Sequence, residues 1–394
     1  MRVAVVTTRR YHLLDLAREL DAQGHRVQFI GCVTRAEAER HGLPAHCLCS
    51  VRRRVWPHLW LERRGPAWLR WHLEPRIAAA VDRAAARRLA RCDVLIGLSG
   101  VSVRVVHKAQ WRFGATVFLE RGGRHILSQK DLLEKIPTMR RPAIPHEEIK
   151  RELWGYNHAD VVVVASRHAR ASFLERGVPS ERLFRIPYGV DLERFAPTMR
   201  RASPQQTVMF VGRWSLTNGC DLLTLAARGQ PWRVIHVGPQ GDAPWPGGRQ
   251  FERRGIVEDW EMASVFREAD ILVRPSRGEG MAMVQAQALA CGVPVVCSDK
   301  SGGEDLRDFL DDPSWVTVVP AGSLEALREG IAVGLERARS QIGRRSILER
   351  QRERLSWRAY GERYAEEIVR RVPEPAEKVS DVVPGVVPVE DPAR

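Results

Sequence analysis

The sequence has 394 residues, of which 44% are hydrophobic, so it is long enough for two domains that each bury a core. Lys and Arg exceed Asp and Glu by 62 to 48, and more than half of the net charge of +14 comes from residues 51–91. The seven cysteines are scattered, which argues against a disulfide framework. The N-terminus does not read as a signal peptide and no apolar run is long enough to span a bilayer, so we expect a cytoplasmic protein.

The first half of the chain alternates apolar strands with helical segments, which predicts a parallel sheet covered by helices. A strand at residues 3–7 leads through a loop containing Arg9, Arg10 and His12 into a helix at residues 13–23. The loop has no Gly-x-Gly-x-x-Gly, which counts against a nicotinamide- or flavin-dependent dehydrogenase. The other strands expected in this half are residues 26–30, 94–97, 115–120 and 161–165.

A basic and aromatic segment interrupts this alternation at residues 51–91, which hold eleven Arg against three acids. Arg interleaved with Trp is typical of an element that touches anionic lipid headgroups. The residues expected to make that contact are Arg52, Arg53, Arg54, Trp56, Trp60, Arg63, Arg64 and Trp68. A solvated helix pair with its Trp side chains packed inward is the alternative. Nucleic-acid binding is disfavoured because no nucleic-acid module is evident.

The second half repeats the alternation, with strands expected at residues 208–211, 234–237, 271–273, 293–297 and 315–319. A second doubly wound domain is therefore predicted. The boundary falls near residues 196–207, where polar residues and Pro replace apolar ones. A last helix follows Ser356, and beyond residue 372 the sequence is rich in Pro, Val and Glu without periodicity, which predicts a disordered tail.

The most informative stretch is residues 275–296, which reads as a loop, a helix and a buried strand. Glu279 stands in a Gly-flanked loop, and Gln287 follows eight positions later on the helix. A helix N-terminus behind such a loop offers free N–H groups and a partial positive charge, which suit a diphosphate. Side chains on either side of the diphosphate would then meet a sugar and a ribose, the layout of a nucleotide sugar.

A second element of this kind is residues 210–219, where a strand ends in Gly212-Arg213 and a short loop with Asn218 leads to another helix. Glycine permits close approach of the backbone, and a guanidinium can hold phosphate oxygens in a bidentate manner. A plain strand end with a surface Arg is the alternative.

The stretch from Glu279 to Val296 resembles the donor-site signature of family-four glycosyltransferases, E-x7-E in the context E-G-F-G-x-x-x-x-E-A-x-A-C-G-x-P-V-V. Gln287 replaces the second Glu, and Asn218 replaces the Lys of the family pattern G-R-x-x-x-x-K-G. Together with Gly302-Gly303-Glu304-Asp305, the Gln resembles a bacterial subgroup of this family. The segment 187–195 looks like the family's interdomain segment.

The resemblance implies an α/β protein of the GT-B fold, in which two Rossmann-like doubly wound domains face a cleft. We expect an acceptor-binding domain at residues 1–195 and a nucleotide-sugar-binding domain at residues 205–355. A helix at residues 356–371 is expected to cross back to the first domain, and residues 372–394 to form the tail.

The resemblance also implies site residues. Arg213 would stabilise the leaving diphosphate, Glu279 would bind the donor sugar, and His125 would bind that sugar near the reacting centre. For His125, a plain helix cap is the alternative. The residues expected to bind the donor are Gly212, Arg213, Asn218, Glu279, Gly280, Met281, Ala282 and Gln287. Arg9, Arg10 and His12 would line the cleft and meet the acceptor or the donor phosphates.

The implied activity is retaining transfer of a sugar from a nucleotide-diphosphate sugar, with a UDP-sugar expected, to a glycan or lipid-linked acceptor at the cytoplasmic membrane face. The family's mechanism is front-face substitution and needs no metal. Cys47 and Cys49, near His41 and His46, lack the spacing of a zinc site. A nucleotide-sugar epimerase or hydrolase and a non-catalytic donor-binding subunit are the alternatives.

Overall fold

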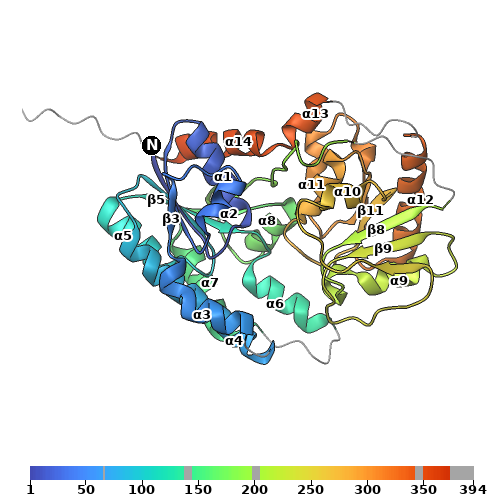
Figure 1. The fold of residues 1–394 in the computed structure, drawn as a ribbon, viewed down its shortest axis with the longest axis horizontal. Coiled ribbons are helices and arrows are strands. Elements are labelled where there is room, and N and C mark those ends of the chain that lie inside the picture. The colour runs from blue at the N-terminus through green and yellow to red at the C-terminus, as the bar shows by residue number, and fades with distance from the viewer. Residues whose placement is uncertain (65–66, 137–143, 198–204, 342–348, 373–394) are drawn as a thin grey trace, which may run out of the picture.

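The structure is a computed structural model that describes residues 1–64, 67–136, 144–197, 205–341 and 349–372, without the side chains of 62, 63, 67–72 and 349. Two parallel β-sheets lie side by side, each with helices on both faces (Figure 1). The expected GT-B architecture is confirmed by this arrangement. The expected boundary at residues 196–207 and the expected tail fall largely outside the described residues.

The first sheet has seven strands in the order β3-β2-β1-β4-β5-β6-β7. Its strands are β1 Arg2–Val6, β2 Arg26–Gly31, β3 Leu48–Ser50, β4 Val94–Leu98, β5 Thr116–Arg121, β6 Val161–Val164 and β7 Leu183–Arg185. The central strands are valine-rich and buried on both faces, as in parallel sheets covered by helices. Because parallel strands all end at one edge, the loops after β1, β4 and β5 gather at the same side of this domain.

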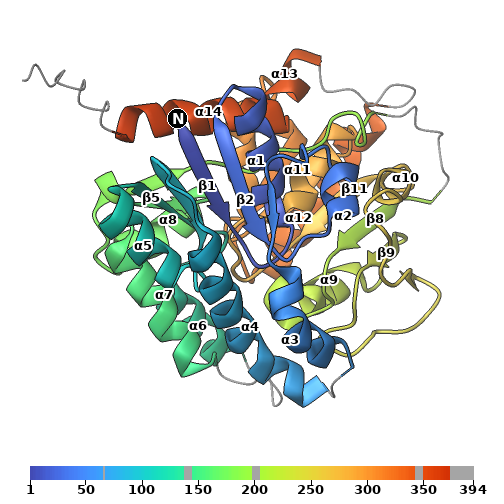
Figure 2. The ribbon, with the colours of Figure 1, turned by 60° about the vertical axis from the view of Figure 1, so that its left-hand side comes forward.

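Helices cover both faces of this sheet (Figure 2). They are α1 Tyr11–Ala22, α2 Arg35–Arg40, α3 Arg52–Arg64, α4 Ala67–Arg88, α5 Val103–Phe113, α6 Ile126–Lys135, α7 His146–His158 and α8 Arg167–Leu174. α5 ends at Gly114, whose φ of 64° is the left-handed conformation that stops a helix. α3 and α4 pack on each other and extend along the periphery of the domain in both views.

The second sheet has six strands in the order β10-β9-β8-β11-β12-β13. They are β8 Thr207–Val211, β9 Arg233–Val237, β10 Phe251–Arg253, β11 Ile271–Arg274, β12 Val295–Ser298 and β13 Val316–Val319. The helices of this half are α9 Cys220–Ala227, α10 Met262–Phe266, α11 Met283–Ala290, α12 Leu324–Arg339 and α13 Glu349–Arg354. The loops after β8, β9 and β11 gather at the edge that faces the first domain.

The last helix, α14 Trp357–Arg371, returns to the first domain and lies along α1 (Figure 1). Ser356 caps it, as its hydroxyl accepts from the N–H of Ala359 at 3.0 Å. Backbone hydrogen bonds join Val190 to Leu355 and Trp357, which fixes the crossover to the interdomain segment. The crossing helix expected from the sequence is confirmed.

All ten strands expected from the sequence are present, with ends that differ by one or two residues. The sequence did not reveal β3, β7 and β10, which are three-residue strands at or next to sheet edges. All seven cysteines are free thiols. Within the described part of the chain, none of the helices has the length and apolarity needed to cross a membrane.

Candidate active site between the two domains

The loop after β11 holds Glu279 by two side chains from its own surroundings. Arg274, the last residue of β11, donates to both carboxylate oxygens at 2.9 and 2.8 Å, and the Ser276 hydroxyl donates at 2.7 Å. The Arg274 side chain is only 4% exposed, whereas that of Glu279 is 22% exposed. The carboxylate is therefore fixed in orientation but remains partly exposed.

The loop after β8 meets this group through Gly212. Arg274 also donates to the carbonyl of Val211, and a Cβ added to Gly212 would lie 2.7 Å from its guanidinium. Gly212 has φ of 127°, so both space and backbone conformation require glycine here. Arg274 thus links the two loops that the sequence singled out.

Arg213 and Asn218 complete the loop after β8. The guanidinium of Arg213 is exposed, and its carbonyl accepts from the Asn218 side-chain amide at 2.8 Å. Asn218 therefore braces the loop rather than presenting a positive charge to the cleft. This arrangement gives a structural reason for Asn where the family pattern has Lys.

α11 begins just after Glu279. In the described structure, the backbone N–H groups of Gly280 and Met281 have no hydrogen-bond partner, and they precede the positive end of the helix. Gln287 lies further along α11 and is half-buried. Free N–H groups beside a helix N-terminus are suited to an anion such as a diphosphate.

A cavity of about 300 Å³ lies between the domains, and Gln287 lines it. Its wall in the second domain includes Gly212, Gly238, Val257 and Met283. Its opposite wall comes from the first domain, the interdomain segment and the last helix, through Arg10, Asp15, His41, Asp191, Arg194 and Trp357. We call it the Gln287 cavity.

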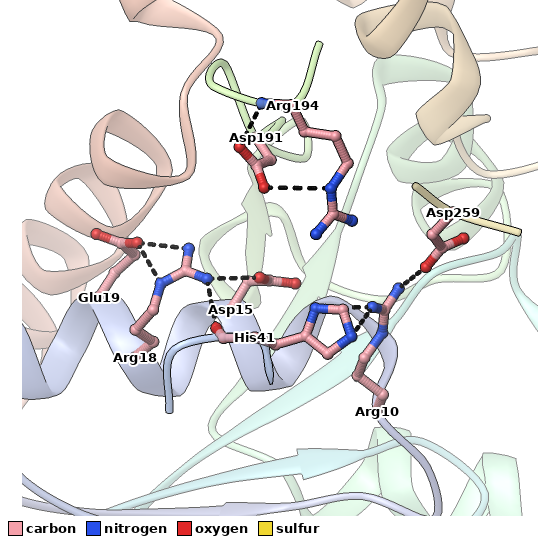
Figure 3. A network of polar contacts seen from close by, with 8 residues as sticks. All are labelled: Arg10, Asp15, Arg18, Glu19, His41, Asp191, Arg194 and Asp259. Atoms are coloured by element: carbon pink, nitrogen blue, oxygen red, sulfur yellow. Dashed lines mark hydrogen bonds and ion pairs between the residues drawn. The ribbon is translucent and has the colours of Figure 1, made fainter. Parts of the chain in front are cut away.

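Arg10 joins the two domains at the mouth of the Gln287 cavity (Figure 3). Its guanidinium donates to Asp259 of the second domain at 2.6 Å and lies 3.0 Å from Nδ1 of His41. Partial burial and the neighbouring guanidinium lower the pKa of His41 to about 4, so the ring is neutral and can accept from Arg10. Arg10 lines the Gln287 cavity, but its guanidinium is engaged by protein groups.

A second cavity, of about 370 Å³, lies in the first domain above the ends of β1, β4 and β5. Arg9 and His12 line it, together with Glu120, Tyr188 and Glu152. Its apolar wall comes from Ile77 and Ala78 of α4 and from Leu98 and Val101. We call it the His12 cavity.

The His12 cavity reaches the donor loop. Gly122 and Gly123 line it, and a Cβ added to Gly280 would clash with the Gly122 carbonyl. The Ser166 hydroxyl also donates to the carbonyl of Gly280 at 2.6 Å. The first domain therefore touches the second next to Glu279, and the His12 cavity opens beside that contact.

The expectation for His125 needs correction. His125 is 4% exposed, packs against the rings of Tyr156 and Phe173, and caps α6 by accepting from the Leu127 N–H at 3.3 Å. It lines neither cavity, and burial lowers the pKa of the ring to about 4. These contacts are those of a structural cap, which the sequence could not distinguish from a sugar-binding histidine.

Two further residues, to which the sequence assigned no role, lie at the contact between the domains. The guanidinium of Arg124, one residue before His125, lies 3.1 Å from where a Cβ of Gly278 would be, so it faces the donor loop. Asp305, from the Gly-Gly-Glu-Asp run, is buried and accepts from the backbone of Arg167 at 3.0 and 3.1 Å. It also pairs with Arg185. Asp305 thus ties the domains together.

Only part of the basic and aromatic segment has described side chains. Trp56 and Trp60 of α3 are 54% and 43% exposed, with ring centroids 6.5 Å apart. Arg53, Arg54 and Arg64 are exposed and Arg52 is half-buried, whereas the side chains of Arg63 and Trp68 lie outside the described residues. The inward packing considered for these Trp residues is contradicted for Trp56 and Trp60.

Comparison with family models assigns both halves of the chain. Residues 10–194 match the family described as Glycosyltransferase Family 4, and residues 205–336 match the one described as Glycosyl transferases group 1. Both domains are therefore similar to glycosyltransferase domains. The first match ends, and the second begins, at the segment between the two sheets.

Curated relatives agree with this assignment. The chain is 30% identical over 226 residues to D-inositol 3-phosphate glycosyltransferase of Xylanimonas cellulosilytica, covering 49% of this chain and 54% of that one. It is 30% identical over 213 residues to GDP-mannose-dependent alpha-mannosyltransferase of Mycobacterium tuberculosis, covering 49% and 53%. The chain thus spans about half the length of the curated relatives it matches.

Solved structures show the same fold. Sucrose-phosphate synthase of Thermosynechococcus elongatus superposes with a TM-score of 0.68 at 17% identity, covering 94% of this chain and 98% of that one. Anabaena HepE in complex with UDP-glucose gives 0.60 at 15% identity, covering 94% and 100%. At such identities the likeness carries the fold alone.

Proposed function

We propose that the chain is a retaining glycosyltransferase that moves a sugar from a nucleotide-diphosphate sugar to a glycan or lipid-linked acceptor. The observation that carries the proposal is the meeting of Glu279, Gly212 and the start of α11 beside two cavities. A nucleotide-sugar donor consists of a sugar, a diphosphate and a nucleoside, and each part needs residues that bind it. We assign the sugar to Glu279, the diphosphate to the start of α11 and the nucleoside to the Gln287 cavity.

The nucleoside occupies the Gln287 cavity in this proposal. Val257, Met283 and Gly238 supply apolar and backbone surface for a base, and the Gln287 amide hydrogen-bonds the ribose. The diphosphate then lies over Gly280 and Met281, with Arg213 free to reach it because no described residue pairs with its guanidinium. The sequence resemblance favours a UDP-sugar as the donor. The denaturation experiment described below therefore compares UDP-sugars with GDP-sugars.

The acceptor occupies the His12 cavity. Its floor is polar and its α4 wall is apolar, which suits a hydroxyl group attached to an apolar body. α4 also packs on α3, whose Trp56 and Trp60 are exposed. This continuity supports a lipid-linked acceptor delivered at an anionic membrane face.

Retention of the anomeric configuration and independence of metal are proposed on the resemblance of the Glu279 stretch. Product analysis by NMR tests the first, and turnover in the presence of EDTA tests the second. A product of inverted configuration contradicts the retaining assignment.

Thermal denaturation with a panel of UDP-, GDP-, ADP- and TDP-sugars tests the donor site. A donor at a hundredfold excess over Kd stabilises the fold by about 2.7 kcal/mol, so the true donor class raises Tm clearly above the others. Val257→Trp fills the Gln287 cavity and should abolish this shift without lowering the ligand-free Tm. Equal shifts in wild type and Val257→Trp would place the donor elsewhere.

A further inference from the structure

A buried hydrogen-bonded chain forms the floor of the His12 cavity. Nε2 of His12 lies 3.0 Å from one carboxylate oxygen of Glu120, and the hydroxyl of Tyr364 donates to the other at 2.8 Å. His12 is 7% exposed, while Glu120 and Tyr364 are 2% and 0% exposed. Three distant parts of the chain, including the returning helix α14, thus converge on one carboxylate.

The hydrogen bond to Glu120 determines which ring nitrogen of His12 carries a hydrogen. A carboxylate accepts hydrogen bonds, so in the neutral imidazole Nε2 of His12 carries the hydrogen and Nδ1 is the unprotonated nitrogen. No described residue hydrogen-bonds Nδ1. Because His12 lines the cavity, Nδ1 is the nitrogen available to a hydroxyl group bound there.

The backbone beside His12 is strained. Tyr11 has φ of 38°, the only positive φ of a residue other than glycine in the described part of the chain. Such a conformation is unfavourable for a residue with a side chain, and it persists only where surrounding contacts enforce it. Tyr11 also lines the cavity, so the strain is located at the turn that presents the imidazole.

The cavity adjoins the place where the proposed donor sugar would lie. Glu120 is the last residue but one of β5, Gly122 follows the end of the strand, and the Gly122 carbonyl is in close contact with Gly280 of the donor loop. The ring of Tyr188 packs against that of His12 in a tilted arrangement, with centroids 4.5 Å apart, and the Tyr188 hydroxyl faces Gly122. His12 therefore stands on the first-domain side of the reacting centre.

From these observations we propose that His12, held by Glu120, is the general base that deprotonates the acceptor hydroxyl. The proposal rests on the proposed function and deepens it. The acceptor O–H gives its proton to Nδ1, and the oxygen lone pair forms the bond to the anomeric carbon. The bond from that carbon to the diphosphate breaks, and its electron pair leaves with the diphosphate.

Glu120 then faces an imidazolium and stabilises it, and the proton passes to water after the product leaves. Glu120 and Tyr364 are positioning residues, because they act through His12 rather than on the acceptor. The role differs from the mechanism implied by the family resemblance, in which the leaving phosphate helps to take this proton.

The first test uses the ligand-free protein. Nitrogen-15 NMR of its histidines, with His12 assigned through His12→Gln, should show Nε2 protonated and Nδ1 bare. A protonated Nδ1 would overturn the proposal, because that nitrogen could accept no proton. Glu120→Gln should change the His12 signals, whereas Tyr364→Phe should change them less.

The second test measures nucleoside diphosphate release from the sugar donor that gives the thermal shift, with water or n-octyl glucoside as acceptor. His12→Gln and His12→Ala should lower the rate by about 10²–10⁴-fold while the donor-induced shift persists. Added imidazole should restore release at least about tenfold in His12→Ala but not in Glu120→Gln. A structural role alone would give no such rescue.

The outcomes separate this inference from the proposed function. Donor binding with equal release by wild type and His12→Gln, or loss without imidazole rescue, overturns the role of His12 only. Donor binding without release by wild type also overturns it. If no nucleotide sugar shifts Tm, the proposed function itself is contradicted.

Discussion

At the scale of single residues, Glu279 is more than a ligand for a sugar. It neutralises the buried guanidinium of Arg274, which in turn holds the backbone beside Gly212. Replacing Glu279 by Ala would leave a buried charge unpaired and destabilise the site itself. A test of its chemical role therefore needs a substitution that keeps the hydrogen bonds.

Glu279→Gln keeps the shape and an acceptor for Arg274 and Ser276 but removes the charge. Loss of one charge-assisted hydrogen bond of about 1.5–3 kcal/mol predicts a fall in transfer of roughly 10- to 100-fold. Steady-state kinetics with the donor identified by thermal shift measures it. Ser276→Ala, which removes one neutral bond and leaves the carboxylate, should stay within about tenfold of wild type. Equal activity of Glu279→Gln and wild type would remove Glu279 from the donor site.

Gln287→Glu should keep transfer within about tenfold of wild type, because a carboxylate also accepts from a ribose hydroxyl. Gln287→Ala removes both the accepting oxygen and the donating NH2 group of the amide, so it should raise the donor Kd. Titration calorimetry with the nucleoside diphosphate alone reports both effects. A hundredfold weakening by Gln287→Glu would mean that the amide N–H group donates an essential bond.

At the scale of elements, His125 shows that a histidine after a strand can either bind a ligand or cap the next helix. The Gly-Gly-Arg-His run after β5 places a histidine near the cleft in the sequence, but the start of α6 turns the ring into the core. Asn is also a favourable helix cap. His125→Asn should therefore retain transfer within about threefold of wild type. A loss above a hundredfold in a folded variant would restore the catalytic assignment.

The same substitution has a consequence for acid stability. The pKa of His125 is lowered from 6.5 to about 4 by burial, so the folded state binds its proton less readily than the unfolded state. Its contribution to stability is present above pH 6.5 and is lost as the pH falls toward 4. His125→Asn should lessen the acid loss by roughly 2–3 kcal/mol. Urea unfolding at pH 7 and pH 4.5 measures it, and equal acid losses would contradict the buried neutral ring.

α3 carries the membrane prediction. Trp56→Ala and Trp60→Ala combined with Arg53→Glu and Arg54→Glu should reduce binding to anionic vesicles by more than about tenfold, since each Arg near such a surface adds about 1 kcal/mol. Trp111 of α5 is 81% exposed and Arg112 follows it, so Trp111→Ala with Arg112→Glu is the matched control. Co-sedimentation at low and high salt measures both. Equal pelleting of the two variants would favour a soluble acceptor.

The elements that the sequence revealed were those with a strong apolar period. The apolar runs of β1, β6 and β8 predict buried parallel strands, and the Glu279 stretch predicts the loop before α11. The strands β3, β7 and β10 have three residues each and little apolar pattern, so only tertiary pairing defines them.

The site was predictable in part for a similar reason. Glu279, Gln287 and Gly212 belong to local motifs. Arg274, however, reads as one polar residue at the end of an apolar strand, and its bond to Glu279 depends on how the loop folds back. The contact of His12 with Glu120 joins residues 108 positions apart, and no local pattern indicates it.

At the scale of the whole molecule, several contacts hold the two domains around the cleft. Arg10 pairs with Asp259, and Asp305 pairs with Arg185 and the backbone of Arg167. α14 crosses from the second domain and delivers the Tyr364 hydroxyl to Glu120. The Gln287 cavity, and the contact between the first domain and the Glu279 loop beside the His12 cavity, therefore depend on the relative position of the two domains.

The most direct measurement is the fate of a nucleotide sugar incubated with the wild-type protein and a lipid extract containing anionic membranes, followed by mass spectrometry. We expect that one class of donor is consumed and that its sugar appears on a lipid-linked or glycan product in amounts equal to the nucleoside diphosphate released. Glu279→Gln in parallel should lower both equally. Consumption of the donor with no glycosylated product, or no binding of any nucleotide sugar, would contradict it.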